Sequence, residues 1–213
     1  MLYDFFFFFQ IAALLVSLKL HKKLPIPYKY FPPFLLLVSL YELGTLRNWF
    51  TIDNSNVWSF NIITSIEFIF YSLVLQFVLS NSKNKDILFY ALIFTIFFTV
   101  LYITFFKSFN TLNTYSFSLQ ALVIITACCS YFYEVMNDAL IETSILSQPG
   151  FWLCTGLLFY YLGGFLFFAS FSYMAYTGSY SYLLLYRGII NVSNIILYSC
   201  LIKSFLCFKH PKI

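Results

Sequence analysis

Residues 41–71 read YELGTLRNWFTIDNSNVWSFNIITSIEFIFY, which is two apolar segments joined across a short polar turn at 51–58. Each segment carries one carboxylate, Glu42 in the first and Glu67 in the second. An ionisable side chain at membrane depth is costly, so it usually faces the protein interior and marks a functional site. These two acids are therefore the starting point for both the fold and the function.

The composition indicates that the whole chain is embedded in a membrane. Of its 213 residues, 61% are hydrophobic and only 9% are charged, whereas about a quarter are charged in an ordinary soluble domain. Aromatic residues reach 23%, which suits lipid-facing helices with Tyr and Trp near the interfaces. No stretch is long and polar enough for a separate soluble domain, so we expect one transmembrane domain over residues 1–213.

The apolar segments predict seven transmembrane helices, because a spanning helix needs about 20 mostly apolar residues. The expected helices cover residues 5–20, 34–50, 59–80, 87–106, 115–135, 151–174 and 182–208. The fold class is therefore all-α, a polytopic membrane bundle. The helix at 87–106 has only threonines as clearly polar side chains, so we expect it at the periphery, facing lipid.

The basic residues predict how the bundle is oriented. One side carries most of them: Lys19, Lys22, Lys23, Lys29, Lys83, Lys85, Lys203, Lys209 and Lys212. The other side has Arg47, Lys107 and Arg187. Because cytoplasmic loops are enriched in Lys and Arg, we expect the N-terminus outside and the C-terminus in the cytoplasm, in a multi-pass protein of the bacterial inner membrane. The net charge of +4 is then a topology signal and predicts no nucleic-acid partner.

Matching motifs suggest an internal repeat. Ile62-Ile63-Thr64 followed by Glu67 in the third helix matches Ile189-Ile190-Asn191 followed by Asn194 in the seventh, at the same spacing. With the fourth helix unmatched, the motifs indicate two parallel halves in a 3+1+3 plan.

That plan resembles the architecture of SWEET and PQ-loop transporters and the seven-helix plan of rhodopsin-like proteins. The chain is also similar to uncharacterised small seven-helix bacterial integral membrane proteins, a similarity that implies no mechanism. The resemblance is architectural only, because the chain has Gln148-Pro149 where the PQ-loop motif needs Pro-Gln, and no functional residue is carried over.

The seventh helix has the best-defined polar face. Its polar side chains, spaced at i, i+4, i+7 and i+11, are Arg187, Asn191, Asn194 and Tyr198. In lipid, such a stripe must face the bundle to find hydrogen-bond partners. Two interpretations remain open: the asparagines join helices by hydrogen bonds, or they line a ligand site.

If the second, third and seventh helices come together, their polar residues line one pocket that opens outward. The candidate ligand-binding residues are Glu42, Arg47, Asn48, Asn61, Glu67, Tyr71, Arg187, Asn191, Asn194 and Tyr198. The two carboxylates and two arginines could form ion pairs with a structural role. Carboxylates that lie close together without a cation would instead suit a proton-coupled carrier or an acid–base site.

Several chemistries have no signature in the chain. It contains no P-loop, no G-x-S-x-G and no H-E-x-x-H motif. Its five cysteines lie in apolar segments without a C-x-x-C pair, and both histidines lie outside those segments. We therefore expect no cofactor and no metal, and we assign no catalytic residue.

The favoured function is an integral membrane protein that binds a small or amphiphilic ligand in the outward pocket, as a sensor, receptor-like protein or accessory subunit. A small proton-coupled 3+1+3 transporter is the alternative. An intramembrane lipid-modifying enzyme that uses Glu42 and Glu67 as acid and base is a second, less favoured alternative. The expected partners are the lipid bilayer, a small-molecule or lipid ligand, and a membrane protein or a second copy of the chain.

Overall fold

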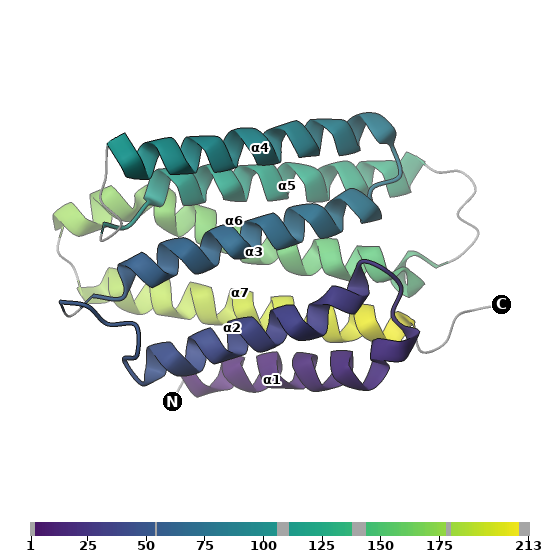
Figure 1. Cartoon of the computed structure of the whole chain (residues 1–213), viewed down its shortest axis with the longest axis horizontal. Coiled ribbons are helices and arrows are strands. Elements are labelled where there is room, and N and C mark those ends of the chain that lie inside the picture. Colours follow the sequence, from purple (N-terminus) through teal and green to yellow (C-terminus); the bar gives the residue numbers. More distant parts are fainter. Residues whose placement is uncertain (1–2, 54, 106–110, 138–143, 178–179, 209–213) are drawn as a thin grey trace.

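The computed structural model describes residues 3–53, 55–105, 111–137, 144–177 and 180–208, apart from the side chains of 3–4 and 170–187. Its long elements are all helices (Figure 1). They are α1 (Tyr3–Leu20), α2 (Phe31–Leu46), α3 (Val57–Val78), α4 (Ser82–Phe105), α5 (Thr114–Asn137), α6 (Pro149–Thr177) and α7 (Tyr180–Cys207). Short 3-10 turns lie at His21–Lys23, Tyr28–Tyr30 and Ile145–Ser147. Between α2 and α3, Ile52 and Ser55 form an isolated antiparallel bridge. The expected all-α fold is confirmed, and each expected helix has a counterpart.

Local chemistry explains where two helix boundaries differ from those expected. α2 ends at Leu46 rather than near residue 50, because Asn48 has a φ of 57° and turns the chain. Asn tolerates this left-handed conformation better than most residues. α4 begins earlier than expected, at Ser82, because the Asn81 side-chain Oδ1 atom accepts a hydrogen bond from the Lys83 N–H at 2.9 Å. This is an N-cap, and it lets the polar residues after it join the helix.

Six of the helices are long and apolar enough to cross a membrane. The exception, α2, has 16 residues and is about 24 Å long, somewhat less than the roughly 30 Å of a bilayer core. Large apolar side chains cover the outside of the described helices, with Phe8 70% exposed, Phe94 60% exposed and Phe97 59% exposed. These features support a multi-pass membrane protein.

The helices form a closed arrangement around a central aromatic core. Along the bundle, α4 packs on α5, α5 on α6, α6 on α7, α7 on α1, and α1 on α2 (Figure 1). Aromatic side chains join α2 to α3, where the rings of Phe34 and Phe70 stack with centroids 3.8 Å apart. The peripheral place expected for the fourth helix agrees with the structure, because α4 contacts α3 and α5 and is the least buried span.

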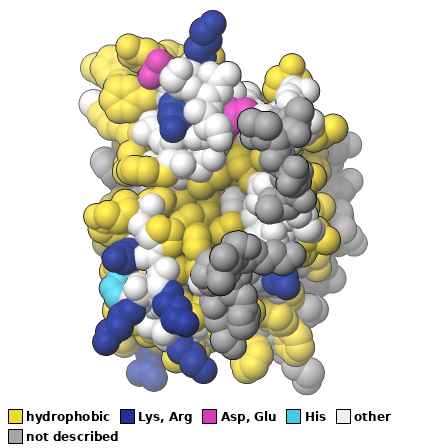
Figure 2. Space-filling view, turned by 90° about the vertical axis from the view of Figure 1, so that its right-hand side faces the viewer, with side chains coloured by type: hydrophobic (Ala, Val, Ile, Leu, Met, Phe, Trp, Pro, Cys, Tyr) yellow, Lys and Arg dark blue, Asp and Glu magenta, His cyan; other side chains and the backbone are white. Residues whose placement is uncertain are grey.

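The basic residues gather at the end of the bundle where α1 ends and α2 begins. Figure 2 looks onto this end and shows clustered Lys and Arg side chains. The described members Lys19, Lys22, Lys23, Lys29, Lys83 and Lys203 are exposed. At the opposite end Arg47 is exposed. Lys107, Lys209, Lys212 and the Arg187 side chain lie outside the described residues, so the charge count at either end covers only part of the expected set.

Close packing between α6 and α7 depends on glycine. A Cβ atom on Gly156 would lie 2.9 Å from the Cys200 Cβ atom and 3.2 Å from the Leu197 carbonyl oxygen. The backbones therefore approach more closely than any larger residue permits, which is how small residues serve helix pairs in membranes. In contrast, a Cβ atom on Gly188 would meet no atom within 4 Å.

We expect Gly156→Ala to lower the free energy of unfolding by about 1–3 kcal/mol, because an added methyl group overpacks this contact. The matched variant Gly188→Ala should leave stability unchanged or raise it by up to about 1 kcal/mol, since alanine favours the helix. Reversible unfolding in mixed micelles measures the free energy of unfolding of both variants. Equal losses in the two variants would contradict the close-packing explanation.

Candidate functional site

A cavity of about 380 Å³ opens at the end of the bundle where α2 ends and α3 begins. We call it the Glu42 cavity. Its polar lining consists of Tyr41, Glu42 and Thr45 from α2, Asn56 at the start of α3, and Asn191 and Asn194 from α7. Its aromatic lining includes Phe6 from α1, Phe60 from α3, and Phe167 and Phe168 from α6. The volume falls in the range of small-molecule sites, about 300–1,000 Å³.

Glu42 is the one charged side chain among the described residues that line this cavity. It is partly buried and projects from α2 next to Tyr41. Arg47, one turn further along, does not pair with it: the Arg47 side chain is exposed and its guanidinium lies 5.9 Å from the ring centre of Trp49. Among the described side chains, no basic group acts on Glu42. Of the alternatives that the sequence leaves open, an ion pair between Glu42 and Arg47 is therefore not the one formed.

Glu67 lies deeper in the bundle than Glu42. The Tyr160 hydroxyl donates a hydrogen bond to its carboxylate, with 3.3 Å between the oxygen atoms. Glu67 is also close enough to Glu42 for their charges to interact. The structure therefore brings together the two acids that the sequence singled out, and no described basic side chain acts on either one.

Four tyrosines surround Glu67 and form what we call the tyrosine layer: Tyr71 from α3, Tyr160 and Tyr161 from α6, and Tyr198 from α7. Tyr71 and Tyr161 are each 2% exposed, and Tyr198 is 4% exposed. The rings of Tyr71 and Tyr161 meet edge to face, with centroids 6.3 Å apart. On α3, α6 and α7 alike, these residues come further toward the basic end than those that line the Glu42 cavity.

The polar stripe of α7 faces the cavity. Asn191 is only 4% exposed and lines the cavity, and its amide has no hydrogen-bond partner in the described part of the chain. Asn194 donates to the Ile190 carbonyl oxygen of its own helix at 3.0 Å. Neither amide is seen to bridge to another described helix, which favours the lining interpretation over the helix-joining one. The Arg187 side chain lies outside the described residues.

Two other candidate residues lie away from the cavity. Asn61 is buried, donates to the Thr111 carbonyl oxygen at 3.0 Å, and accepts from the Asn113 N–H at 3.3 Å. It thus ties α3 to the segment before α5, which is a structural role. Asn48 is exposed in the turn after α2. Neither residue, nor Arg47, is among the described residues that line the Glu42 cavity. A ligand contact by any of the three stays a sequence prediction.

Sequence reasoning missed the aromatic walls and the hydrogen-bond partner of Glu67. Phe60, Phe167 and Phe168 line the cavity, but the chain has 29 phenylalanines and nothing in the local pattern distinguishes these. Tyr160 did leave a signal, because Tyr160-Tyr161-Leu162-Gly163 parallels the Tyr41-Glu42-Leu43-Gly44 motif of the second helix.

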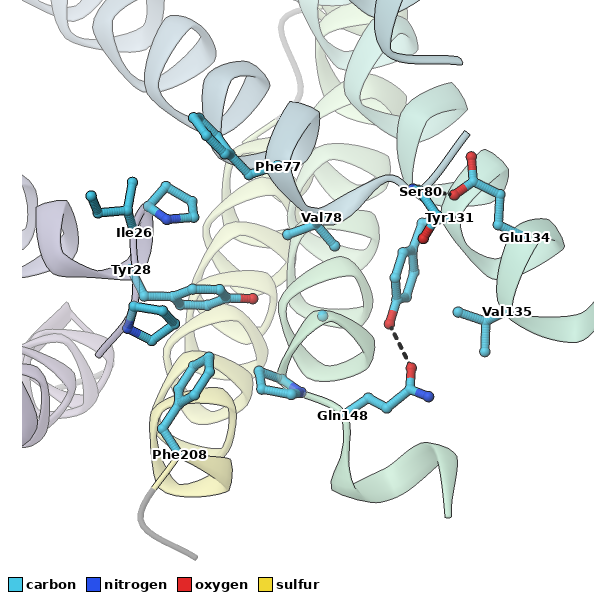
Figure 3. Close-up of a pocket in the computed structure, with 14 residues that line it drawn as sticks. Ile26, Tyr28, Phe77, Val78, Ser80, Tyr131, Glu134, Val135, Gln148 and Phe208 are labelled. Carbon is cyan, nitrogen blue, oxygen red and sulfur yellow. Dashed lines mark hydrogen bonds between the residues drawn. The ribbon is translucent and has the colours of Figure 1, made fainter. Parts of the chain in front are cut away.

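A second cavity of about 430 Å³ lies at the basic end, between the turn before α2 and the nearby ends of α3, α5, α6 and α7 (Figure 3). The Tyr131 hydroxyl points into it and donates to the Gln148 Oε1 atom at 3.2 Å. Glu134 accepts hydrogen bonds from the Ser80 N–H and the Asn84 side chain, each at 2.6 Å. Glu134 therefore anchors the start of α4, and both of its carboxylate oxygens already accept a hydrogen bond.

Comparisons with known protein families, with curated proteins and with solved structures find no match for the chain. The resemblance to SWEET, PQ-loop and rhodopsin-like proteins thus stays a statement about architecture. Among the described residues, no group of three or more His, Cys, Asp or Glu side chains could hold a metal ion. Function has to be inferred from the two cavities and the groups that line them.

A double-mutant cycle tests the link between α3 and α6. We expect Tyr160→Phe and Glu67→Leu to be coupled by about 0.6 kcal/mol, and by no more than about 1.7 kcal/mol, the range for hydrogen bonds between membrane helices. Leucine is used because glutamine would still accept the Tyr160 hydroxyl. The control cycle pairs Glu67→Leu with Tyr131→Phe in the second cavity, and should be additive within about 0.5 kcal/mol. Additivity in both cycles would show that the Tyr160 hydrogen bond does not contribute to stability.

Proposed function

We propose that this chain is a multi-pass membrane protein that binds a small ligand in the Glu42 cavity, as a receptor-like protein or as an accessory subunit. The observation that carries the proposal is the convergence of Glu42, Asn191 and Asn194 on one cavity from helices far apart in the sequence. Ligand sites combine mostly apolar walls with a few convergent polar groups, and the Glu42 cavity has this composition.

The charge distribution supports an outward-facing cavity. The Glu42 cavity opens at the end opposite the exposed lysines of the loop between α1 and α2. With those lysines in the cytoplasm, as positive charges prefer, a ligand reaches the cavity from outside the cell. The receptor-like reading needs a membrane partner for output, because the described residues form only the bundle and its short connections.

A thermal-shift screen tests the binding proposal. The purified protein is heated with small organic cations, neutral polar molecules, organic anions and short-chain lipids. We expect a member of one class to raise Tm by about 5 °C at about 100 times its Kd. Asn194→Phe should abolish the shift, because the larger side chain fills the cavity.

The matched control is Val192→Phe on the same helix, where the side chain is 55% exposed on the outside. It should keep the wild-type shift. The proposal fails if no class produces a shift, or if the shift survives in Asn194→Phe.

A carrier is the second candidate, and the cavity at the basic end favours it. The two cavities lie at opposite ends of the bundle, and the tyrosine layer lies between them along α3, α6 and α7. An alternating-access carrier needs a central site that each end can reach in turn. Glu67 occupies that central position, and the proposed 3+1+3 repeat would place the site between two related halves.

For the carrier, we expect Glu67→Gln to abolish uptake driven by a proton gradient while the protein still folds, because the amide cannot exchange a proton. Uptake is measured with proteoliposomes that are placed in a solution of the binder from the thermal-shift screen, and circular dichroism checks the fold. The matched control Asp53→Asn changes an exposed acid between α2 and α3 and should transport normally. Wild-type uptake that persists in Glu67→Gln would remove Glu67 from any proton step.

A further inference from the structure

We infer that the Glu42 cavity accommodates a small organic ammonium cation. This inference rests on the proposed ligand-binding function and narrows it to one chemical class. Three features of the cavity carry it: the charge of its lining, the aromatic walls, and the side-chain amide of Asn191.

The charge of the lining favours a cation. Glu42 lines the cavity and Glu67 lies close enough behind it for the two charges to interact. No described basic side chain acts on either carboxylate, because Arg47 is directed to the Trp49 ring. Two like charges near each other at membrane depth disfavour an anionic ligand. A bound cation would offset the negative charge of both carboxylates.

The aromatic walls favour an organic cation over a metal ion. Phe60 and Phe168 have ring centroids 6.0 Å apart, and Phe167 and Phe168 meet edge to face at 5.0 Å. Aromatic faces attract ammonium groups, and cages of such rings recognise quaternary ammonium ligands. A divalent metal ion such as Ca²⁺ draws on Asp and Glu carboxylates for much of its coordination, and Glu42 is the one carboxylate among the described residues of the lining.

Asn191 adds a site for a polar substituent. Its side chain is 4% exposed, lines the cavity, and has no hydrogen-bond partner among the residues that the structure describes. Because Asn191 lines the cavity, its side-chain amide can exchange hydrogen bonds with a hydroxyl or carbonyl group of a ligand. The volume of about 380 Å³ leaves room for an ammonium head and a short polar chain.

A pair of probes that differ only in charge tests the inference. Choline carries a trimethylammonium group, and 3,3-dimethylbutan-1-ol is its uncharged carbon counterpart with the same shape. We expect isothermal titration of the purified protein to give choline at least about tenfold tighter binding than the neutral probe, the scale of a desolvated cation–π contact with charge support.

Two variants test which lining residues cause the preference for choline over the neutral probe. Glu42→Gln should bring the two affinities within about threefold of each other, and Phe60→Leu should weaken choline binding more than binding of the neutral probe. Asp53→Asn, which removes an exposed acid at the same end, should keep the wild-type preference. The Phe60 variant keeps the test decisive if Glu42→Gln does not fold.

The outcomes separate this inference from the binding function. Equal or tighter binding of the neutral probe, or a preference for choline that survives in Glu42→Gln, overturns the cation assignment. If an anion or a neutral molecule binds and Asn194→Phe abolishes that binding, the cavity remains a ligand site and only its class is wrong. If nothing in the thermal-shift screen binds, both the proposed ligand-binding function and the assignment of the ligand as a cation are wrong.

Discussion

Glu67 needs polar partners inside the bundle, because an acid at membrane depth finds none in lipid. Much of the central packing follows from this need. Its carboxylate accepts the Tyr160 hydroxyl and lies beside Tyr71, Tyr161 and Tyr198. A charged or polar group at this depth needs such partners, because the surrounding hydrocarbon supplies none. The helices α3, α6 and α7 therefore meet around one acid, and their tyrosines are polar at the hydroxyl and apolar elsewhere.

The bundle combines two ways of packing helices. Between α6 and α7, Gly156 allows the backbones to approach closely. Between α2 and α3, large rings make the contact, as Phe34 stacks on Phe70 and meets Tyr71 edge to face. These rings lie toward the basic end of the two helices, and the Glu42 cavity opens at their other end, where α7 contributes Asn191 and Asn194 to the wall.

The sequence predicted the helices well because hydropathy over about 20 residues is a strong signal in a membrane chain. It also predicted the meeting of Glu42, Glu67, Asn191 and Asn194, since polar residues in apolar helices have to turn inward. It did not distinguish Asn61, which satisfies backbone groups near Thr111, from a ligand-facing asparagine. It could not select Phe60 or Phe168 either, because the position of an aromatic wall depends on helix rotation, and phenylalanines occur on every face.

The tyrosine layer also bears on how a membrane potential would fall across the bundle. A membrane potential falls mainly across the part of a protein from which water is excluded. Where both cavities hold water, that part shrinks from the full bilayer to the few residues around Tyr71, Tyr161 and Tyr198. Moving one charge across the whole potential is worth about 2.3 kcal/mol per 100 mV. A proton that reaches or leaves Glu67 would then sense a large share of this energy over a short distance.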